Sequence, residues 1–144
     1  MKLGINGKLY QNTGAYATPT WVEITNVRDL TLNMDAAEAD ATTRANNRWR
    51  ATAAALRDAS VEFEMVWDPA DAGFQAIRDA WKDGTDLEMA VVDGDITTAG
   101  TQGLRATFAI TGFNRNEPLE DTMTANVTIK PGYSANPPEW HETP

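Results

Sequence analysis

Apolar and polar residues alternate with a period of two along most of this chain, which predicts strands with one buried face. The clearest example lies at 58–67, where four large apolar residues alternate with glutamate and valine. These four are Val61, Phe63, Met65 and Trp67. Similar alternation predicts further strands at about 8–10, 21–25, 29–34, 87–92, 104–113 and 122–130. We expect the strands at 21–25 and 29–34 to pair with each other through the connection at 26–28.

A single helix is predicted directly after the strand at 58–67, because the apolar spacing there changes from two to three and four residues. Asp68 is a suitable N-cap, and Pro69 suits the first helical position, where a missing N–H costs nothing. Gly84 can adopt the left-handed conformation that ends a helix. The helix is therefore expected at about 69–83, and its apolar side is expected to pack against the sheet through Phe74, Ile77 and Trp81.

These patterns together predict a mainly β fold, because the strands do not alternate regularly with helices. We expect an antiparallel β-sandwich or barrel of about seven strands with one flanking α-helix at about 69–83. The expected organisation is a single β domain at 1–132, followed by a C-terminal tail at 133–144. The two prolines at 137–138 favour extended, flexible chain in that tail. Trp140 is out of place in a flexible tail unless it docks on something.

The segment at 35–55 predicts a long protruding hairpin. It is rich in alanine, but it has no stripe of large apolar residues at helical spacing, and its threonines and asparagines compete with helical hydrogen bonds. We interpret it as two extended arms joined by a loop near 45–47. The arms have little to bury by themselves, so the hairpin needs a partner surface; a mobile surface loop is the alternative. Its tip gathers Arg44, Arg48, Trp49 and Arg50.

Composition and charge exclude several classes of protein. The 144 residues include no cysteine, which excludes disulfides, thiolate zinc sites and cysteine nucleophiles. Residues 1–60 carry seven basic and six acidic side chains (+1), whereas residues 61–144 carry five and fifteen (−10). A basic nucleic-acid groove is therefore not expected. The N-terminus has no apolar signal-peptide core, and no apolar run approaches 18 residues, so a cytosolic origin without a signal peptide or membrane span is expected.

No catalytic, metal or cofactor site is expected. His141 lies in the predicted tail, without a rigid pocket or an orienting partner. The run Asp93-Gly94-Asp95 begins like a calcium loop, but the required glycine and glutamate are absent from its sixth and twelfth positions, so a turn is expected. The five tryptophans leave a carbohydrate-binding module as an alternative function, with Trp21 or Trp49 as its exposed platform.

Several segments resemble the siphophage-type major tail tube proteins. They are GKLY, WVEITNVRDLTLNM, EADATTR, AAALRDASVEFEMVWDPADAGFQAIRDAWKDG and TFAITGFNRNEPLEDTMTANVTIKP, and together they span about residues 3–133. The order of elements carries the resemblance: two strands, a long hairpin, the strand–helix unit and three closing strands. No single motif is diagnostic, and tube subunits of the type VI secretion kind remain an alternative.

This resemblance implies a non-enzymatic virion protein that self-assembles into hexameric rings, which stack as a tube. Strands of neighbouring subunits would close a β-barrel lumen, through which DNA passes only as transient, non-specific cargo. The hairpin at 35–55 and the terminal segments at 1–5 and 133–144 would reach neighbouring subunits and rings. The implied interface residues are Arg44, Arg48, Trp49, Arg50 and Trp140. The resemblance further implies assembly in the host cytoplasm, with the tape measure and tail terminator proteins as partners.

Overall fold

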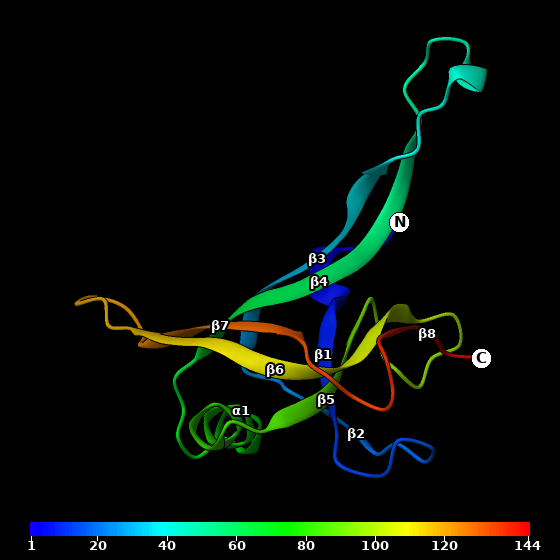
Figure 1. Ribbon diagram of the computed structural model, residues 1–144. Coiled ribbons are helices and arrows are strands. Elements are labelled where there is room, and N and C mark those ends of the chain that lie inside the picture. Colours follow the sequence, from blue (N-terminus) through cyan, green and yellow to red (C-terminus); the bar gives the residue numbers. More distant parts are fainter.

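The computed structural model describes residues 1–144 as one antiparallel β-sheet with a single α-helix (Figure 1). The strands are β1 (Lys8–Asn12), β2 (Trp21–Glu23), β3 (Val27–Asp40), β4 (Thr52–Val66), β5 (Asp86–Val92), β6 (Gln102–Asn116), β7 (Thr124–Pro131) and β8 (Glu139–Glu142). The helix is α1 (Ala72–Asp83), and two short 3₁₀ helices are η1 (Gly4–Asn6) and η2 (Arg44–Asn46). The predicted fold class is confirmed, with eight strands instead of about seven.

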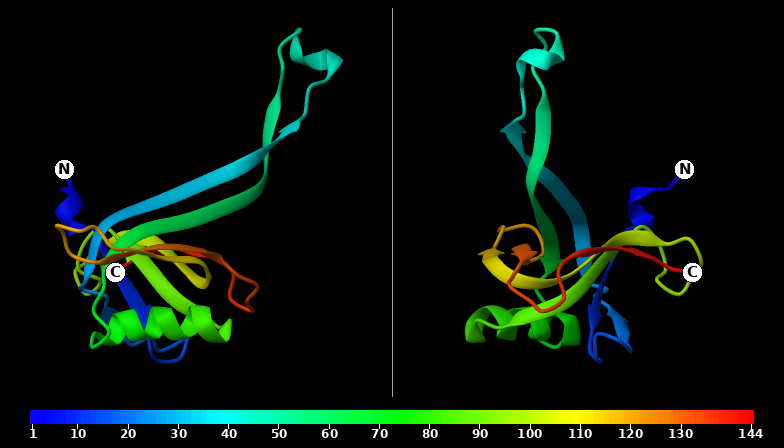
Figure 2. Two further views of the ribbon diagram at one scale, coloured as in Figure 1. Left: turned by 90° about the vertical axis from the view of Figure 1, so that its left-hand side faces the viewer. Right: turned by 45° about the vertical axis from the view of Figure 1, so that its right-hand side comes forward.

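The strands lie in the order β2-β1-β5-β6-β7-β4-β3, and β8 joins β6. Strand β6 is long enough to pair with three neighbouring strands. On one side β5 pairs with 103–109, and on the other side β8 pairs with 102–105 and β7 with 108–116. Figure 2 shows the β3–β4 hairpin projecting far beyond the body of the domain, while α1 lies across the opposite side of the body.

The main core lies between the curved sheet and α1. Strands β4 and β7 bury every second residue, as the alternation predicts: Val61, Met65 and Ile129 are completely buried. The core also takes side chains from β1, α1, β5 and β6. A smaller apolar cluster of Tyr10, Ala90, Val92 and Ile96 covers the other face of β1 and β5. Most of this burial lies within the body, so the projecting hairpin adds little to it.

Helix α1 begins three residues later than predicted. Asp71, not Asp68, is the N-cap: its carboxylate accepts a hydrogen bond from the backbone N–H of Phe74 at 2.9 Å. Asp68 instead closes a turn, in which its side chain accepts from the N–H of Ala70. Asp71 stands three residues before Phe74, so its carboxylate reaches an N–H that the first helical turn leaves unpaired. Gly84 ends the helix at φ 69°, as predicted, and α1 is neither long nor apolar enough to cross a membrane.

The predicted pairing of the strands at 21–25 and 29–34 is wrong. Strand β2 pairs with β1, and β3 pairs with β4. Alternation identifies a strand but not its partner. Leu30 and Leu32 lie opposite Phe63 and Val61 in the register, so β3 reaches the core only beside β4. The extended arms predicted at 35–55 are confirmed as the outer halves of these two strands.

The segment at 133–144, predicted as a flexible tail, contains β8. Its four residues pair with the start of β6, from Gln102↔Glu142 to Arg105↔Glu139. The segment has too few apolar residues for alternation to reveal a strand, and it is held by a long-range polar contact described below.

Candidate functional site

The most exposed part of the molecule is the β3–β4 arm, which we define as residues 34–58. Within it only Asn46 and Ala51 are even partly buried. The two strands pair from Asp35↔Asp58 to Asp40↔Thr52, with one irregularity between 36 and 38. The two arm strands therefore pair with each other along their length, and no residue of the arm belongs to either apolar cluster.

Local hydrogen bonds order the tip of the arm at residues 41–51. The side-chain amide of Asn46 donates to the carbonyl of Trp49, and the N–H of Trp49 donates to the carbonyl of Asn46. Asn47 and Arg48 have positive φ values of 49° and 67°, which lets the chain reverse. At the start of the tip, hydrogen bonds from the side chain and backbone of Thr42 lower the pKa of Asp40.

The tip brings together four of the predicted interface residues, Arg44, Arg48, Trp49 and Arg50. Trp49 is 75% exposed, and none of the three arginines lies within 4.0 Å of a carboxylate. The fifth predicted residue, Trp140, lies in β8, where its indole N–H donates to Gln102 at 3.2 Å. It is 54% exposed and is separate from the tip of its own chain.

The predicted helix-packing residues divide into two groups. Phe74 and Ile77 are 1% and 0% exposed and pack into the main core. Trp81 is 53% exposed, although its ring stacks on Phe113 with centroids 6.3 Å apart. Trp81 therefore covers an edge of the core and leaves half of its surface open.

Several stretches of sheet edge have no strand partner, and two of them lie on β3 and β6. Strand β3 pairs only with β4, so its outer edge is open along the whole strand. Strand β6 loses its partner β5 after Ala109, so 110–116 has an open edge on that side. Open edges present unpaired backbone N–H and C=O groups, and proteins usually pair or protect them.

The sheet face opposite the core is polar along β3, β4 and β7. The register places Thr31 opposite Glu62, and Glu62 opposite Thr128, while Glu64 lies opposite Asn126. Because directly opposed residues share a face, these side chains form one polar surface. Asp35 and Asp58 continue it toward the arm.

Arg105 forms a buried polar centre that the sequence analysis missed. Its side chain is 9% exposed, and its guanidinium lies 2.5 Å from the Glu88 carboxylate and 3.6 Å from that of Glu139 in β8. It also donates to the carbonyl of Tyr16 at 2.7 Å, and it lies 3.9 Å from the centroid of the Tyr16 ring. This one side chain therefore fastens β8 and the loop at 13–20 onto the sheet. Alternation in the predicted strand at 104–113 puts Arg105 on the face opposite Leu104 and Ala106, but it does not show that β8 and the loop at 13–20 cover that face.

Tyr16 and His141 surround this centre without forming a catalytic arrangement. Burial, followed by the hydrogen bond to Glu139, raises the pKa of the Tyr16 phenol. His141 is partly buried, although it lies in the segment predicted as a flexible tail: its ring lies 6.3 Å edge-on from Trp21, and its Nε2 lies 3.3 Å from the hydroxyl of Thr143. No carboxylate orients the imidazole, so the pair required for general acid–base chemistry is missing.

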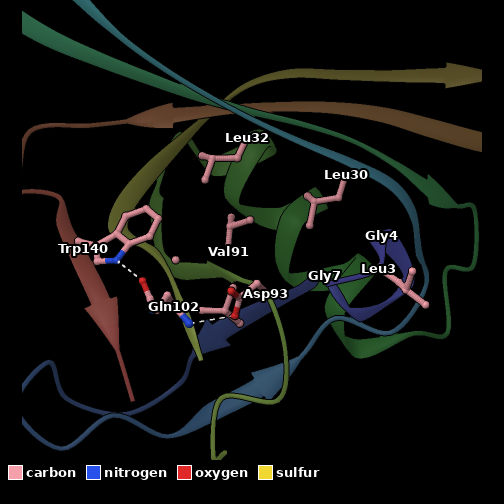
Figure 3. A pocket seen from close by; sticks show the side chains of 11 residues that line it. Leu3, Gly4, Gly7, Leu30, Leu32, Val91, Asp93, Gln102 and Trp140 are labelled. Atoms are coloured by element: carbon pink, nitrogen blue, oxygen red, sulfur yellow. Dashed lines mark hydrogen bonds between the residues drawn. The ribbon is translucent and has the colours of Figure 1, made fainter. Parts of the chain in front are cut away.

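The pockets of the molecule lie open at its surface. One of ≈ 410 Å³ lies between the N-terminal segment, β3 and the ends of β5 and β6 (Figure 3). Leu30, Leu32 and Val91 point into it, and Asp93 is its only ionisable residue. No three His, Asp or Glu side chains are grouped so that they could hold a metal ion. The run at Asp93–Asp95 forms a turn, in which hydrogen bonds from Thr97 lower the pKa of Asp95.

A carbohydrate platform is also absent from the tryptophan positions. Trp21 is half-buried under the guanidinium of Arg105, at 5.1 Å from its ring centroid, whereas Trp49 is at the arm tip. The Trp21 ring lies in the body and the Trp49 ring lies at the tip of the arm, so the two rings do not form one platform. The arrangement offers assembly surfaces: a basic aromatic tip, two open sheet edges and a polar sheet face.

A family model described as phage tail tube protein matches residues 8–131. In fold the chain is similar to a protein from the tail of an empty gene transfer agent particle with C6 symmetry, with a TM-score of 0.74 at 18% identity and 100% of both chains covered. A chain of the native gene transfer agent virion gives a TM-score of 0.74 at 19% identity, with 98% of this chain and 99% of that chain covered. The tail tube protein of SPP1 gives a TM-score of 0.73 at 15% identity, with 90% of this chain and 75% of that chain covered. No curated protein sequence gives a significant match.

Proposed function

This chain belongs to the phage tail tube protein family, and we propose that it assembles into hexameric rings that stack as a tube for the passage of DNA. The family is structural, and the chain is a component of the tail of a phage-like particle and not an enzyme. The similar gene transfer agent tail has C6 symmetry, which supports six copies per ring.

The two open sheet edges carry this proposal. The outer edge of β3 and the free edge of β6 at 110–116 lie at the two ends of the four-strand series β6-β7-β4-β3. If β3 of one subunit pairs with β6 of the next, both edges are satisfied and the four strands of each copy continue around the ring. Closure of a barrel is the one arrangement that leaves no edge exposed.

The polar sheet face supports a lumen for DNA. In such a ring the buried face of β4 and β7 points outward to α1, so the opposite face points to the axis. This face carries Glu62, Glu64, Asp35 and Asp58, against the basic residues Lys130 and Arg28, the latter 3.3 Å from Glu64. Four acidic and two basic groups give −2 per copy. A negatively charged lumen repels the phosphates of DNA and lets DNA move through it without binding.

The arm supplies the ring-to-ring contact in this proposal. Arg44, Arg48, Trp49 and Arg50 form its exposed tip, and Trp140 adds an exposed aromatic surface on the body. The tape measure and tail terminator proteins are the further partners, and assembly takes place in the host cytoplasm. DNA is transient cargo.

Electron microscopy of the purified, concentrated protein tests the proposal. We expect rings or tubes with six-fold top views in negative stain, and a mass distribution above the monomer in light scattering. A strictly monomeric protein that forms no rings, alone or with other tail proteins, would contradict it.

A further inference from the structure

The curled sheet leaves a gap between its two end strands. The strand order begins with β2 and ends with β3, and a pocket of ≈ 620 Å³ lies between them. We call it the gap pocket; the segments 4–9, 23–25 and 27–31 line it. Because β3 pairs only with β4, the pocket adjoins the free edge of β3.

The opposite end of the four-strand series β6-β7-β4-β3 carries Trp81. This side chain is 53% exposed, and its ring stacks on Phe113 of β6. Phe113 lies within 110–116, where β6 has no partner on the β5 side. About half of Trp81 is therefore open beside the free edge of β6. A large exposed aromatic side chain at an unpaired edge is typical of an interface between proteins.

Phe113 and Leu30 lie at the two ends of one row of the sheet. Phe113 is opposite Val127, which is opposite Phe63. Phe63 in turn is opposite Leu30, which lines the gap pocket. When the β6 edge of one copy meets the β3 edge of the next, this row continues from Phe113 to Leu30 of the next copy, apart from the offset that strand tilt introduces. The gap pocket covers 27–31 of β3 and so allows for such an offset.

The gap pocket has one charged residue without an ionic partner. Lys8 is paired with Glu23 at 3.7 Å, and Arg28 is paired with Glu64 at 3.3 Å. Asp29 also lines the pocket, and no basic group lies within 4.0 Å of its carboxylate. The pocket therefore favours a basic partner beside Asp29.

The flank of α1 next to Trp81 is basic. Successive helical residues are turned by about 100°, so Arg78 and Lys82 lie within about 100° of Trp81, whereas Asp79 and Asp83 lie about 160° away. Arg78 is paired with Asp79 at 3.0 Å, but no carboxylate lies within 4.0 Å of the Lys82 ammonium. An exposed indole and a free cation thus lie side by side.

We propose that Trp81 of one copy docks in the gap pocket of the next copy of this chain in the ring, where Lys82 pairs with Asp29. The indole covers the apolar lining of the pocket, which includes Ile5, Ile24, Val27 and Leu30. Each copy uses α1 toward one neighbour and its gap pocket toward the other, which is the heterologous geometry that closes a ring. This contact rests on the ring proposed above, and it joins the copies outside the strands that line the lumen.

Charge reversal in mixed variants tests the contact. Lys82→Glu and Asp29→Lys each place like charges at every contact when all copies carry the same change. Both side chains are exposed, so circular dichroism should show a native fold for each variant. We expect the protein concentration for half-maximal ring formation to rise at least about tenfold for either variant alone. In an equimolar mixture, a six-membered ring can alternate the two variants, so that opposite charges meet at every contact. The mixture should then lower that concentration at least about tenfold below the value for either variant alone.

The matched control is Glu120→Lys, which makes the same change as Asp29→Lys on an exposed residue of the β6–β7 loop. It should form rings like the unmodified protein, and it should give no recovery when it is mixed with Lys82→Glu. If the unmodified protein forms rings but the 82–29 mixture does no better than the separate variants, the inference is overturned and the proposed function stands. Rings of either single variant at the unmodified concentration would equally overturn it. Absence of rings from the unmodified protein would contradict both.

Trp81→Ala tests the apolar part of the contact. Phe74 and Ile77 remain to hold α1 on the core, so the domain should keep its circular dichroism spectrum. The concentration for half-maximal ring formation should rise at least about tenfold, as expected for an aromatic residue at the centre of an interface. A folded Trp81→Ala protein that forms rings at the unmodified concentration would contradict the inference.

Discussion

Arg105 gives the sharpest test of how this fold is held together. Arg105→Met keeps much of the side-chain volume but removes the charge that faces Glu88 and Glu139. The Glu88 side chain is only 15% exposed and would be left without its cation. Removing one member of a buried ion pair costs about 3–5 kcal/mol, and the lower end applies because Glu88 keeps some contact with water.

We therefore expect the free energy of unfolding to fall by about 3 kcal/mol, which for a chain of this size lowers Tm by roughly 10 °C. Urea denaturation followed by tryptophan fluorescence measures the loss. The matched control is Arg115→Met in the same strand, because the Arg115–Glu117 pair is about half exposed on both sides. Exposed pairs contribute less than about 1 kcal/mol.

A double-mutant cycle with Glu88→Gln separates the pair from the packing. If the ion pair dominates, the double variant is less destabilised than the sum of the single variants by about 2 kcal/mol. A loss for Arg105→Met no larger than that for Arg115→Met would refute the reasoning. Faster hydrogen exchange in β8 is expected as well, because Arg105 fastens that strand through Glu139.

Three further outcomes are expected. Deletion of residues 45–50 leaves the domain folded by circular dichroism but prevents stacking in micrographs, since the tip contributes nothing to the core; tubes of unchanged length would contradict this. Asp71→Ala lowers the free energy of unfolding by about 1 kcal/mol by removing the α1 cap, whereas Asp68→Ala has a smaller effect. The pKa of the Tyr16 phenol is raised in the folded state, so the protonated phenol contributes to the stability of the fold. This contribution is fully present below the unfolded pKa of about 10 and is lost as pH rises through the folded pKa. Wild-type stability should then fall more steeply above pH 10 than that of Tyr16→Phe; parallel titration curves would refute this.

Much of the local structure could be predicted from single residues and their spacing. Alternation at Val61, Phe63 and Met65 identified β4 and its buried face, and Gly84 marked the end of α1. The lack of large apolar residues at 35–55 indicated an extended arm with little of its own to bury. These features follow from short-range periodicity and backbone preference, which act within a few residues of chain.

The partners of these elements could not be predicted in the same way. Nothing near Trp21 specifies that β2 pairs with β1, and nothing near Trp140 specifies that β8 pairs with β6. The gap pocket joins residues 4–9 to 27–31, and the Arg105 centre joins Tyr16, Glu88 and Glu139. Contacts of this kind depend on many long-range pairings at once.

The sequence by itself determined that this chain is a β-rich domain with one short helix and an extended arm whose tip is basic, and it contained no catalytic motif. It also carried the pattern of the tail tube proteins, to which the chain belongs. Only the tertiary structure decided which sheet edges stay open, which carboxylates share the polar face and where β2 and β3 leave the gap pocket between them. The physical reason is that alternation sets which face a residue occupies, whereas the partner across the ladder is chosen by packing of the whole sheet.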